Sequence, residues 1–212
     1  LRVQQVRRQK IFLTCLFLLI VGCILLRFSK FSGRQKETHQ INAACEAYRD
    51  EVSSEAAQYD MSDYVDLILA VMMQESSGQG TDPMQSSEGA YNTRYPQQPN
   101  GITDPSYSIS CGIQELKYAL EKAVCTGPTD LSKIRLALQA YNFGADSYFA
   151  YLEENGQTVW TTQSAQAFAQ MASGGTQRDE DDPLHDPAGP WDYGDQYYPD
   201  HVLRYYHLDN NS

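Results

Sequence analysis

Acidic residues are absent from the first 36 positions of the 212-residue chain, and basic residues are scarce in the rest. Residues 1–36 hold eight of the sixteen Lys and Arg residues, so the remainder carries eight basic side chains against all 27 acidic ones. A protein that binds nucleic acid needs a basic face to contact the phosphates. We therefore expect no nucleic-acid partner.

The sequence patterns of metal sites are also missing. The four histidines form no His-Glu-x-x-His pattern, and no pair of the five cysteines has the spacing of zinc ligands. The acidic stretch 179–186 lacks the spacing of a calcium loop, so a solvated loop is expected there. We expect neither a metal nor a cofactor. Cys111 and Cys125 could form a disulfide, or both could be small buried thiols together with Cys45.

The longest apolar run lies near the N-terminus, at positions 11–26, with basic residues at both ends. It is slightly shorter than the ~20 residues that span a bilayer, and the residues that follow could extend it. No small-residue cleavage site is evident, which favours a retained single-pass transmembrane helix over a cleaved signal peptide. The basic residues before the run predict an exported remainder, outside the cell membrane. An alternative is a lipoprotein anchored at Cys23. The expected organisation is an anchor with its basic segment (1–31), a linker (32–41) and a folded domain (42–208).

A buried helix is predicted between Tyr64 and Gly80. Residues 67–73 are all apolar, which indicates a helix enclosed on most sides, and Gly78 is the expected C-terminal stop. Glu75 falls in the last turn, where desolvation and the negative end of the helix dipole favour its protonated form. A carboxyl group that is neutral near pH 7 can act as a general acid. On this segment alone, a solvated Glu at a helix end is the simpler explanation.

The rest of the domain is predicted to be helical as well. A long polar loop with interspersed tyrosines, 78–110, suits either the wall of a sugar-binding cleft or an ordinary surface loop. No alternating strand pattern is present, so the expected fold class is all-α, or nearly so, around the Tyr64 helix. The other helices are expected at 42–59, 111–124, 131–144, 145–154, 163–172 and 197–207.

Three short motifs occur in the order seen in lysozyme-like and soluble lytic transglycosylase domains. They are Gln-Glu-Ser-Ser-Gly at 74–78, Ser-Cys-Gly-Ile-Gln at 110–114 and Ala-Tyr-Asn-Phe-Gly at 140–144. Residues 82–88 and 197–206 resemble the narrower CwlT-type lysozyme branch. One such motif is weak evidence, but three in order behind a buried helix are strong. The resemblance covers about 42–207 and implies a lysozyme-like domain.

The resemblance implies a muramidase that cleaves the β-1,4 bond between N-acetylmuramic acid and N-acetylglucosamine in peptidoglycan. Glu75 matches the catalytic acid of the family, and Gln114 matches the Gln that lines the cleft. Tyr141 and Asn142 match the third motif, near the acid and the sugar, although Tyr141 also completes an apolar stripe and could serve core packing. The polar loop supplies further candidates for glycan binding: Gln85, Ser86 and Ser87.

A glycoside hydrolase usually has a second carboxylate that activates water. Glu88 and Asp104 are the candidates, and either could instead be a solvated loop charge. Without a second carboxylate, a hydroxyl of the substrate could attack and give a 1,6-anhydro product, the lytic transglycosylase outcome. A third possibility, a non-catalytic wall-binding scaffold of a secretion apparatus, is disfavoured by the intact Glu75.

The resemblance also suggests a biological role. CwlT-type proteins are associated with conjugative elements, which implies local wall opening for a conjugative secretion complex, and wall remodelling during growth fits equally well. The chain ends at Ser212, which leaves no room for the cysteine-peptidase domain of bifunctional CwlT-type proteins. Only the glycosidase activity is therefore expected.

Overall fold

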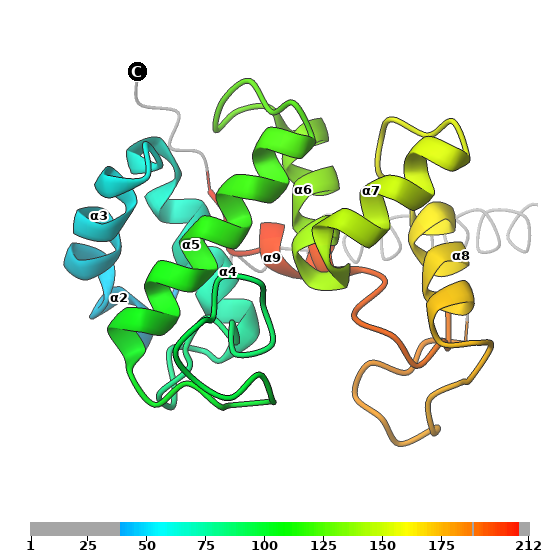
Figure 1. Ribbon diagram of the computed structural model, residues 1–212, viewed down its shortest axis with the longest axis horizontal. Helices are drawn as coiled ribbons and strands as arrows, with labels where there is room; N and C mark the ends of the chain where they lie inside the picture. Colours follow the sequence, from blue (N-terminus) through cyan, green and yellow to red (C-terminus); the bar gives the residue numbers. More distant parts are fainter. Residues whose placement is uncertain (1–38, 188, 208–212) are drawn as a thin grey trace, which may run out of the picture. The chain divides into compact units, whose positions relative to one another are not determined.

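The computed structural model describes residues 39–187 and 189–207, and every regular element in these ranges is a helix (Figure 1). One isolated antiparallel bridge joins Gln177 to Trp191. The predicted all-α fold class is therefore confirmed for this part of the chain. The elements are α2 (Ala43–Glu46), α3 (Arg49–Gln58), η1 (Ser62–Tyr64), α4 (Val65–Glu75), α5 (Pro105–Lys122), α6 (Leu131–Phe143), α7 (Ala145–Glu154), α8 (Thr162–Ala172) and α9 (Tyr198–Leu203).

The predicted membrane anchor, residues 1–31, lies outside the described residues, as does most of the predicted linker at 32–41. Within 39–187 and 189–207, none of the helices is long and apolar enough to cross a membrane.

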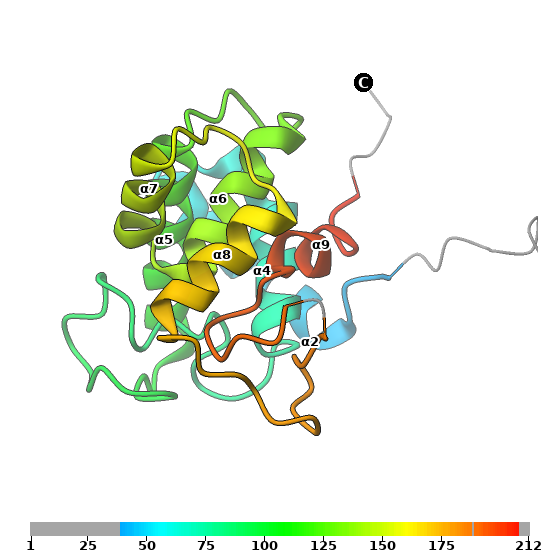
Figure 2. The same ribbon diagram turned by 90° about the vertical axis from the view of Figure 1, so that its right-hand side faces the viewer.

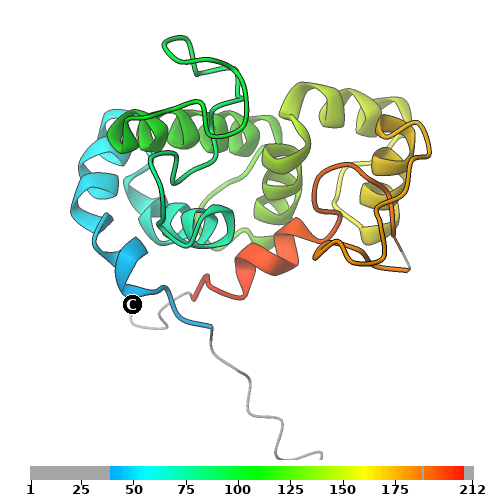
Figure 3. The same cartoon turned by 90° about the horizontal axis from the view of Figure 1, so that it is seen from below.

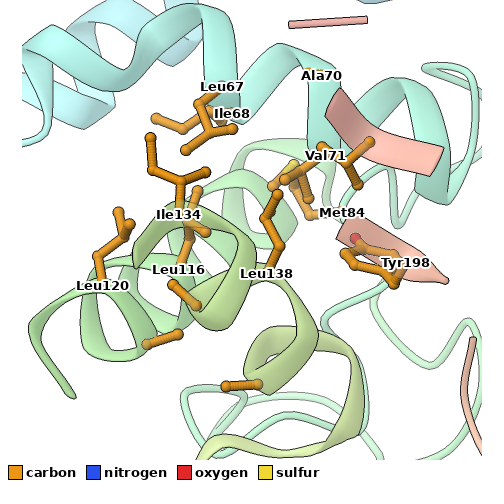
Figure 4. Packing of buried hydrophobic residues seen from close by; sticks show 14 of the residues in the cluster. Leu67, Ile68, Ala70, Val71, Met84, Leu116, Leu120, Ile134, Leu138 and Tyr198 are labelled. Carbon is orange, nitrogen blue, oxygen red and sulfur yellow. The ribbon is translucent and has the colours of Figure 1, made fainter. Parts of the chain in front are cut away.

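Helix α4 forms the centre of the core, as its apolar run predicts. Residues 67–72 are all fully buried. Their side chains meet those of α5 and α6, including Leu116 and Leu138 (Figure 4). Each large aliphatic side chain buried in this way contributes about 1.5–3 kcal/mol. The helix packs against α9 on one side (Figure 2) and against α3 on another (Figure 3), so it is held from several directions.

Helix α6 connects this core to the second half of the domain. It packs against α5, α7 and α9. Its last residue, Phe143, stacks on Phe168 of α8 with ring centroids 5.2 Å apart and meets Tyr148 of α7 edge-on at 5.4 Å. Aromatic contacts of this kind fix α7 and α8 beside the end of α6 (Figure 1).

Several boundaries differ from the sequence-based expectation, three of them in ways that change an element. The helix predicted at 42–59 is interrupted between α2 and α3. Helix α5 begins at Pro105, six residues before the predicted start, because Asp104 caps it and proline suits the first helical turn. The closing helix is shorter than predicted and ends at Leu203. Of the two expectations for the cysteines, the structure has free thiols: Cys45 and Cys111 are buried and Cys125 is partly exposed.

Candidate active site

Glu75 is the last residue of α4, and its carboxyl group is largely enclosed by protein. Burial raises the pKa of Glu75 to about 7. A hydrogen bond from Tyr198 acts in the opposite direction, whereas the negative charges of Asp195, Asp82 and Glu115 raise the pKa further. The carboxyl group of Glu75 thus retains its proton at pH values well above the usual pKa of a glutamate, as the sequence predicts. It can therefore serve as a general acid.

Two tyrosines lie beside this carboxyl group. The Tyr198 hydroxyl donates a hydrogen bond to Glu75 Oε1. The ring of Tyr141 stacks on that of Tyr198 at 6.3 Å, and its hydroxyl donates to the carbonyl oxygen of Met84 at 3.0 Å. Burial, followed by the charge of Glu75, raises the pKa of Tyr141 well above its usual value. The third motif therefore does bring its tyrosine near Glu75, but the direct bond comes from α9.

The loop after α4 is organised by the buried carboxylate of Asp82. Its Oδ1 accepts hydrogen bonds from the Ser86 amide at 3.0 Å and the Ser108 hydroxyl at 2.6 Å. Its Oδ2 accepts from both the amide and the hydroxyl of Ser87. A carboxylate bonded in this way ties the loop to the first turns of α5 and fixes the backbone around Met84.

The three loop residues predicted to bind glycan lie in different environments. Gln85 is exposed, and its amide donates to the Asn100 side chain at 3.0 Å. Ser86 and Ser87 are each only 1% exposed. The Ser87 hydroxyl also accepts from the Ile102 amide at 2.8 Å, so both serines build the loop around Asp82.

The predicted residues of the second and third motifs also make internal contacts. The Gln114 amide donates to the carbonyl oxygen of Ser110, one turn back on α5, at 3.1 Å. Oδ1 of Asn142 accepts from the backbone amide of Asp195 at 2.7 Å. Asn142 thereby connects the end of α6 to the segment that leads into α9.

The two predicted second carboxylates, Glu88 and Asp104, are not among the described groups that shift the pKa of Glu75. Glu88 lies exposed on the loop. The Asp104 carboxylate accepts from the amides of Ser106 and Tyr107 and is the N-cap of α5. These contacts give Asp104 a structural task, and the catalytic role of either residue stays a proposal.

Sequence reasoning missed Glu115, which lies one residue after the second motif. Its Oε1 is buried, has no hydrogen-bond partner among the described residues, and lies against Gly89 of the loop. Burial raises the pKa of Glu115 to about 7, and the Asp82 charge adds to the effect. With α5 starting at Pro105, helical spacing places Glu115 on the same face as Ser108. That spacing is the signal that could have identified it.

Tyr198 was missed for a similar reason. The sequence predicts a closing helix with Val202, Tyr205 and Tyr206 facing inward, and Tyr198 lies one turn before Val202. Residues four apart on a helix share a face, so the same pattern also places Tyr198 in the core, where it is 2% exposed.

A separate pocket lies in the acidic segment, and none of the predicted site residues lines it. It is lined by residues 176–179, 181, 182 and 192. The side chain of Arg178, 6% exposed, holds the segment together by donating to the carbonyl oxygen of Gly194 at 2.7 Å. Its acidic residues are mostly exposed, as expected for a solvated loop.

Helical architecture and the carboxyl group at the end of α4 define a lysozyme-like domain. The family model described as Lysozyme-like matches residues 43–206. The chain therefore belongs to the lysozyme-like family, and its domain is of the CwlT type.

Several known proteins are similar to this chain. The bifunctional muramidase/DL-endopeptidase CwlT of Bacillus subtilis (strain 168) is 35% identical over 80% of this chain and 44% of that protein. The uncharacterized membrane protein YocA of the same organism is 40% identical over 52% of this chain and 45% of that protein. The chain thus spans about half the length of the curated relatives it matches.

A similar structure is also known. It is a crystal structure of a protein described as similar to a lipoprotein of the NLP/P60 family from Staphylococcus aureus subsp. aureus Mu50. The TM-score is 0.67 with 27% identity, covering 82% of this chain and 56% of that one.

Proposed function

We propose that the protein is a peptidoglycan hydrolase of the muramidase type, which cleaves the β-1,4 bond between N-acetylmuramic acid and N-acetylglucosamine. The observation that carries this proposal is the enclosed carboxyl group of Glu75 at the end of a buried helix, where Tyr198 donates a hydrogen bond to it and burial raises its pKa to about 7. The Bacillus subtilis relative, named as a bifunctional muramidase/DL-endopeptidase, supports it.

In this mechanism Glu75 protonates the leaving glycosidic oxygen. Oε1 accepts the Tyr198 hydrogen bond, so the transferable proton resides on Oε2. As the bond to the leaving sugar breaks, positive charge develops at the anomeric carbon and water adds there. The water loses a proton to a base, for which Glu88 and Asp104 are the proposed groups. Glu75 is then reprotonated from solvent before the next cycle.

The alternative product is a 1,6-anhydro sugar, as in a lytic transglycosylase. The observation that favours it is that Asp104 is the N-cap of α5, where its Oδ1 accepts from two backbone amides and only Oδ2 remains for a water molecule. In that case a hydroxyl of the muramic acid attacks the anomeric carbon and no water is consumed.

The cellular setting is also part of the proposal. The apolar run at 11–26 supports a single-pass anchor with the lysozyme-like domain outside the cell membrane. Tethering confines cleavage to the wall near the membrane, which suits local opening during conjugative transfer beside a secretion complex, or remodelling during growth.

The test is digestion of purified peptidoglycan by the full chain, followed by mass spectrometry of the products. We expect fragments that end in reducing N-acetylmuramic acid, and loss of activity in Glu75→Gln. Anhydro ends would identify the transglycosylase instead. A fully active Glu75→Gln variant, or wild-type protein that is inert on several peptidoglycans, would refute the proposal.

A further inference from the structure

Ser108 is a fully buried serine near the start of α5, and its hydroxyl group makes two hydrogen bonds. It donates to Oδ1 of Asp82 at 2.6 Å and accepts from the backbone amide of Met84 at 3.1 Å. A hydroxyl carries a single proton, so the bond to Asp82 directs that proton and turns the lone pairs towards Met84. The orientation of the Ser108 hydroxyl is therefore fixed by both of its partners.

Met84 is fully buried and is held against α5 at a second point. Gly112 lies one turn after Ser108, and a Cβ atom there would come within 2.6 Å of Cβ of Met84. The carbonyl oxygen of Met84 accepts from the Tyr141 hydroxyl at 3.0 Å and from the Ser86 hydroxyl at 3.4 Å. Because its amide is bonded to α5 and its carbonyl oxygen to α6, Met84 connects the two helices.

Tyr141 extends these contacts to the candidate acid. Its ring stacks on that of Tyr198, with centroids 6.3 Å apart and an angle of 21° between the ring planes. The Tyr198 hydroxyl in turn donates to Oε1 of Glu75. Close-packed interiors transmit small displacements, so a shift of the Met84 carbonyl group would move the Tyr141 ring and its neighbour. A continuous series of direct contacts thus leads from Ser108 to Glu75.

Ser87 makes the same two kinds of bond at another point of the loop. Its hydroxyl donates to Oδ2 of Asp82 and accepts from the Ile102 amide at 2.8 Å. Alanine at either serine therefore removes one bond to the same carboxylate and one bond to a backbone amide. The two positions differ in what lies beyond that amide, because the carbonyl oxygen of Ile102 accepts from Thr81 at 2.9 Å and not from a tyrosine. Ser87 is thus a matched control for Ser108.

We propose that Ser108 is a positioning residue of the candidate active site, which fixes the carbonyl oxygen of Met84 and, through it, the Tyr141 ring beside Glu75. Ser108 neither binds the glycan nor exchanges a proton with it. Its effect is on the orientation of the acid, so it should appear in kcat and leave KM unchanged. This inference rests on the proposed role of Glu75 as the acid.

The first test needs no substrate. The full chain, labelled with ¹³C at tyrosine Cζ, is observed by NMR in detergent micelles, and the Tyr141 signal is assigned by its loss in Tyr141→Phe. The chemical shift of Cζ reports the hydrogen bond that the hydroxyl makes. We expect Ser108→Ala to displace the Tyr141 signal by more than its line width and Ser87→Ala to leave it in place. An unmoved signal in folded Ser108→Ala, or equal displacements in both variants, would overturn the proposal.

The second test is a double-mutant cycle in kcat on purified peptidoglycan. Ser108→Ala and Tyr141→Phe should each lower kcat by about tenfold or more, with KM unchanged. Because both act through the same contact, the double variant should lose no more than the larger single loss. Ser87→Ala combined with Tyr141→Phe should instead lose the product of the two single factors. Losses that also multiply for Ser108 and Tyr141 would indicate a merely structural role for Ser108 and contradict the proposal.

Ser108→Cys keeps both tests decisive if Ser108→Ala does not fold. A thiol is a weaker donor and acceptor than a hydroxyl, so the expected effects have the same direction and a smaller size. The two tests also distinguish this proposal from the proposed function. Wild-type protein that is inert on peptidoglycan would refute the proposed function, whereas the Tyr141 signal would still decide whether Ser108 positions the ring.

Discussion

The Tyr198 hydroxyl donates a hydrogen bond to Oε1 of Glu75 across 123 positions of sequence. The bond joins the last helix, α9, to the central helix, α4. It orients the carboxyl group and leaves Oε2 as the oxygen that can carry the proton. The final segment of the domain therefore contributes directly to the candidate active site.

Replacing Tyr198 with Phe should distinguish the two effects of its hydrogen bond on Glu75: orientation of the carboxyl group and lowering of its pKa. The hydrogen bond lowers the pKa of Glu75, so its loss should move the alkaline limb of the pH–rate profile to higher pH. The rate at the optimum should fall by about tenfold or more, because a loosened catalytic group loses its productive geometry. Both effects can be measured on purified peptidoglycan.

The matched control for that experiment is Tyr206→Phe. The Tyr206 hydroxyl donates to the carbonyl oxygen of Pro128 at 2.8 Å. This variant loses one buried hydroxyl from the same C-terminal segment but should keep the wild-type pH profile. A Tyr198→Phe profile indistinguishable from that of the control would show that the hydrogen bond has no functional role.

Gly112, in the second motif, should not tolerate alanine. A Cβ atom there would lie 2.6 Å from Cβ of Met84, whose carbonyl oxygen accepts from Tyr141. The helix would gain about 1 kcal/mol in propensity, but the overpacking costs about 1–3 kcal/mol and would displace the loop. We expect Gly112→Ala to lower both the melting temperature and the activity.

Gly127 provides the comparison, because a Cβ atom there meets nothing within 4 Å. Gly127→Ala should be neutral or slightly stabilising. Equal melting temperatures for the two variants would mean that α5 and the Met84 loop can move apart at no cost.

The role of Asp104 can be tested with a variant that keeps an N-cap oxygen on α5 but carries no charge. Asp104→Ala should destabilise the fold by about 1 kcal/mol, whereas Asp104→Ser retains an N-cap oxygen and most of the stability. If Glu88 is the base, Asp104 only caps α5, and the Ser variant should retain its activity per folded molecule. A large loss of rate in a fully folded Ser variant would instead identify Asp104 as the base.

Local patterns account for what the sequence could predict. The apolar run 67–72 and the stop near Gly78 locate α4 and place Glu75 at its end. Gly78 is needed there because its φ is +73° and a Cβ atom would lie 2.8 Å from the amide nitrogen of Cys45. The apolar run and the glycine after it lie within a few residues of each other, so one sequence is enough to reveal them, whereas the close approach of Cys45 is a tertiary contact.

The contacts to Glu75 could not be predicted in the same way. Tyr198 reaches it from the far end of the chain, where the charge of Asp195 also raises the pKa of Glu75. Glu115 could be recognised only with the true start of α5. Composition also misleads in the loop, since Ser86 and Ser87 look suited to a sugar but are buried, with their hydroxyl groups bonded to Met84 and Asp82. Tertiary packing decides which polar groups remain free to bind a substrate.

Glu115 should make stability depend on pH in a predictable direction. Burial raises its pKa from 4.5 to about 7, so the folded state binds more protons than the unfolded state between these values. The free energy of unfolding therefore falls as pH rises through this window, and the whole loss is present above pH 7. Its unpartnered Oε1 is consistent with a carboxyl group that is costly to ionise.

Glu115→Gln removes this ionisation and should stabilise the protein selectively at high pH. The gain over wild type should be small near pH 4.5 and reach at most about 3 kcal/mol near pH 8. Thermal unfolding of both proteins at the two pH values measures it, and Glu88→Gln, on the exposed loop, should show no such difference. A gain that is the same at both pH values would mean that Glu115 ionises as readily in the folded protein as in the unfolded chain.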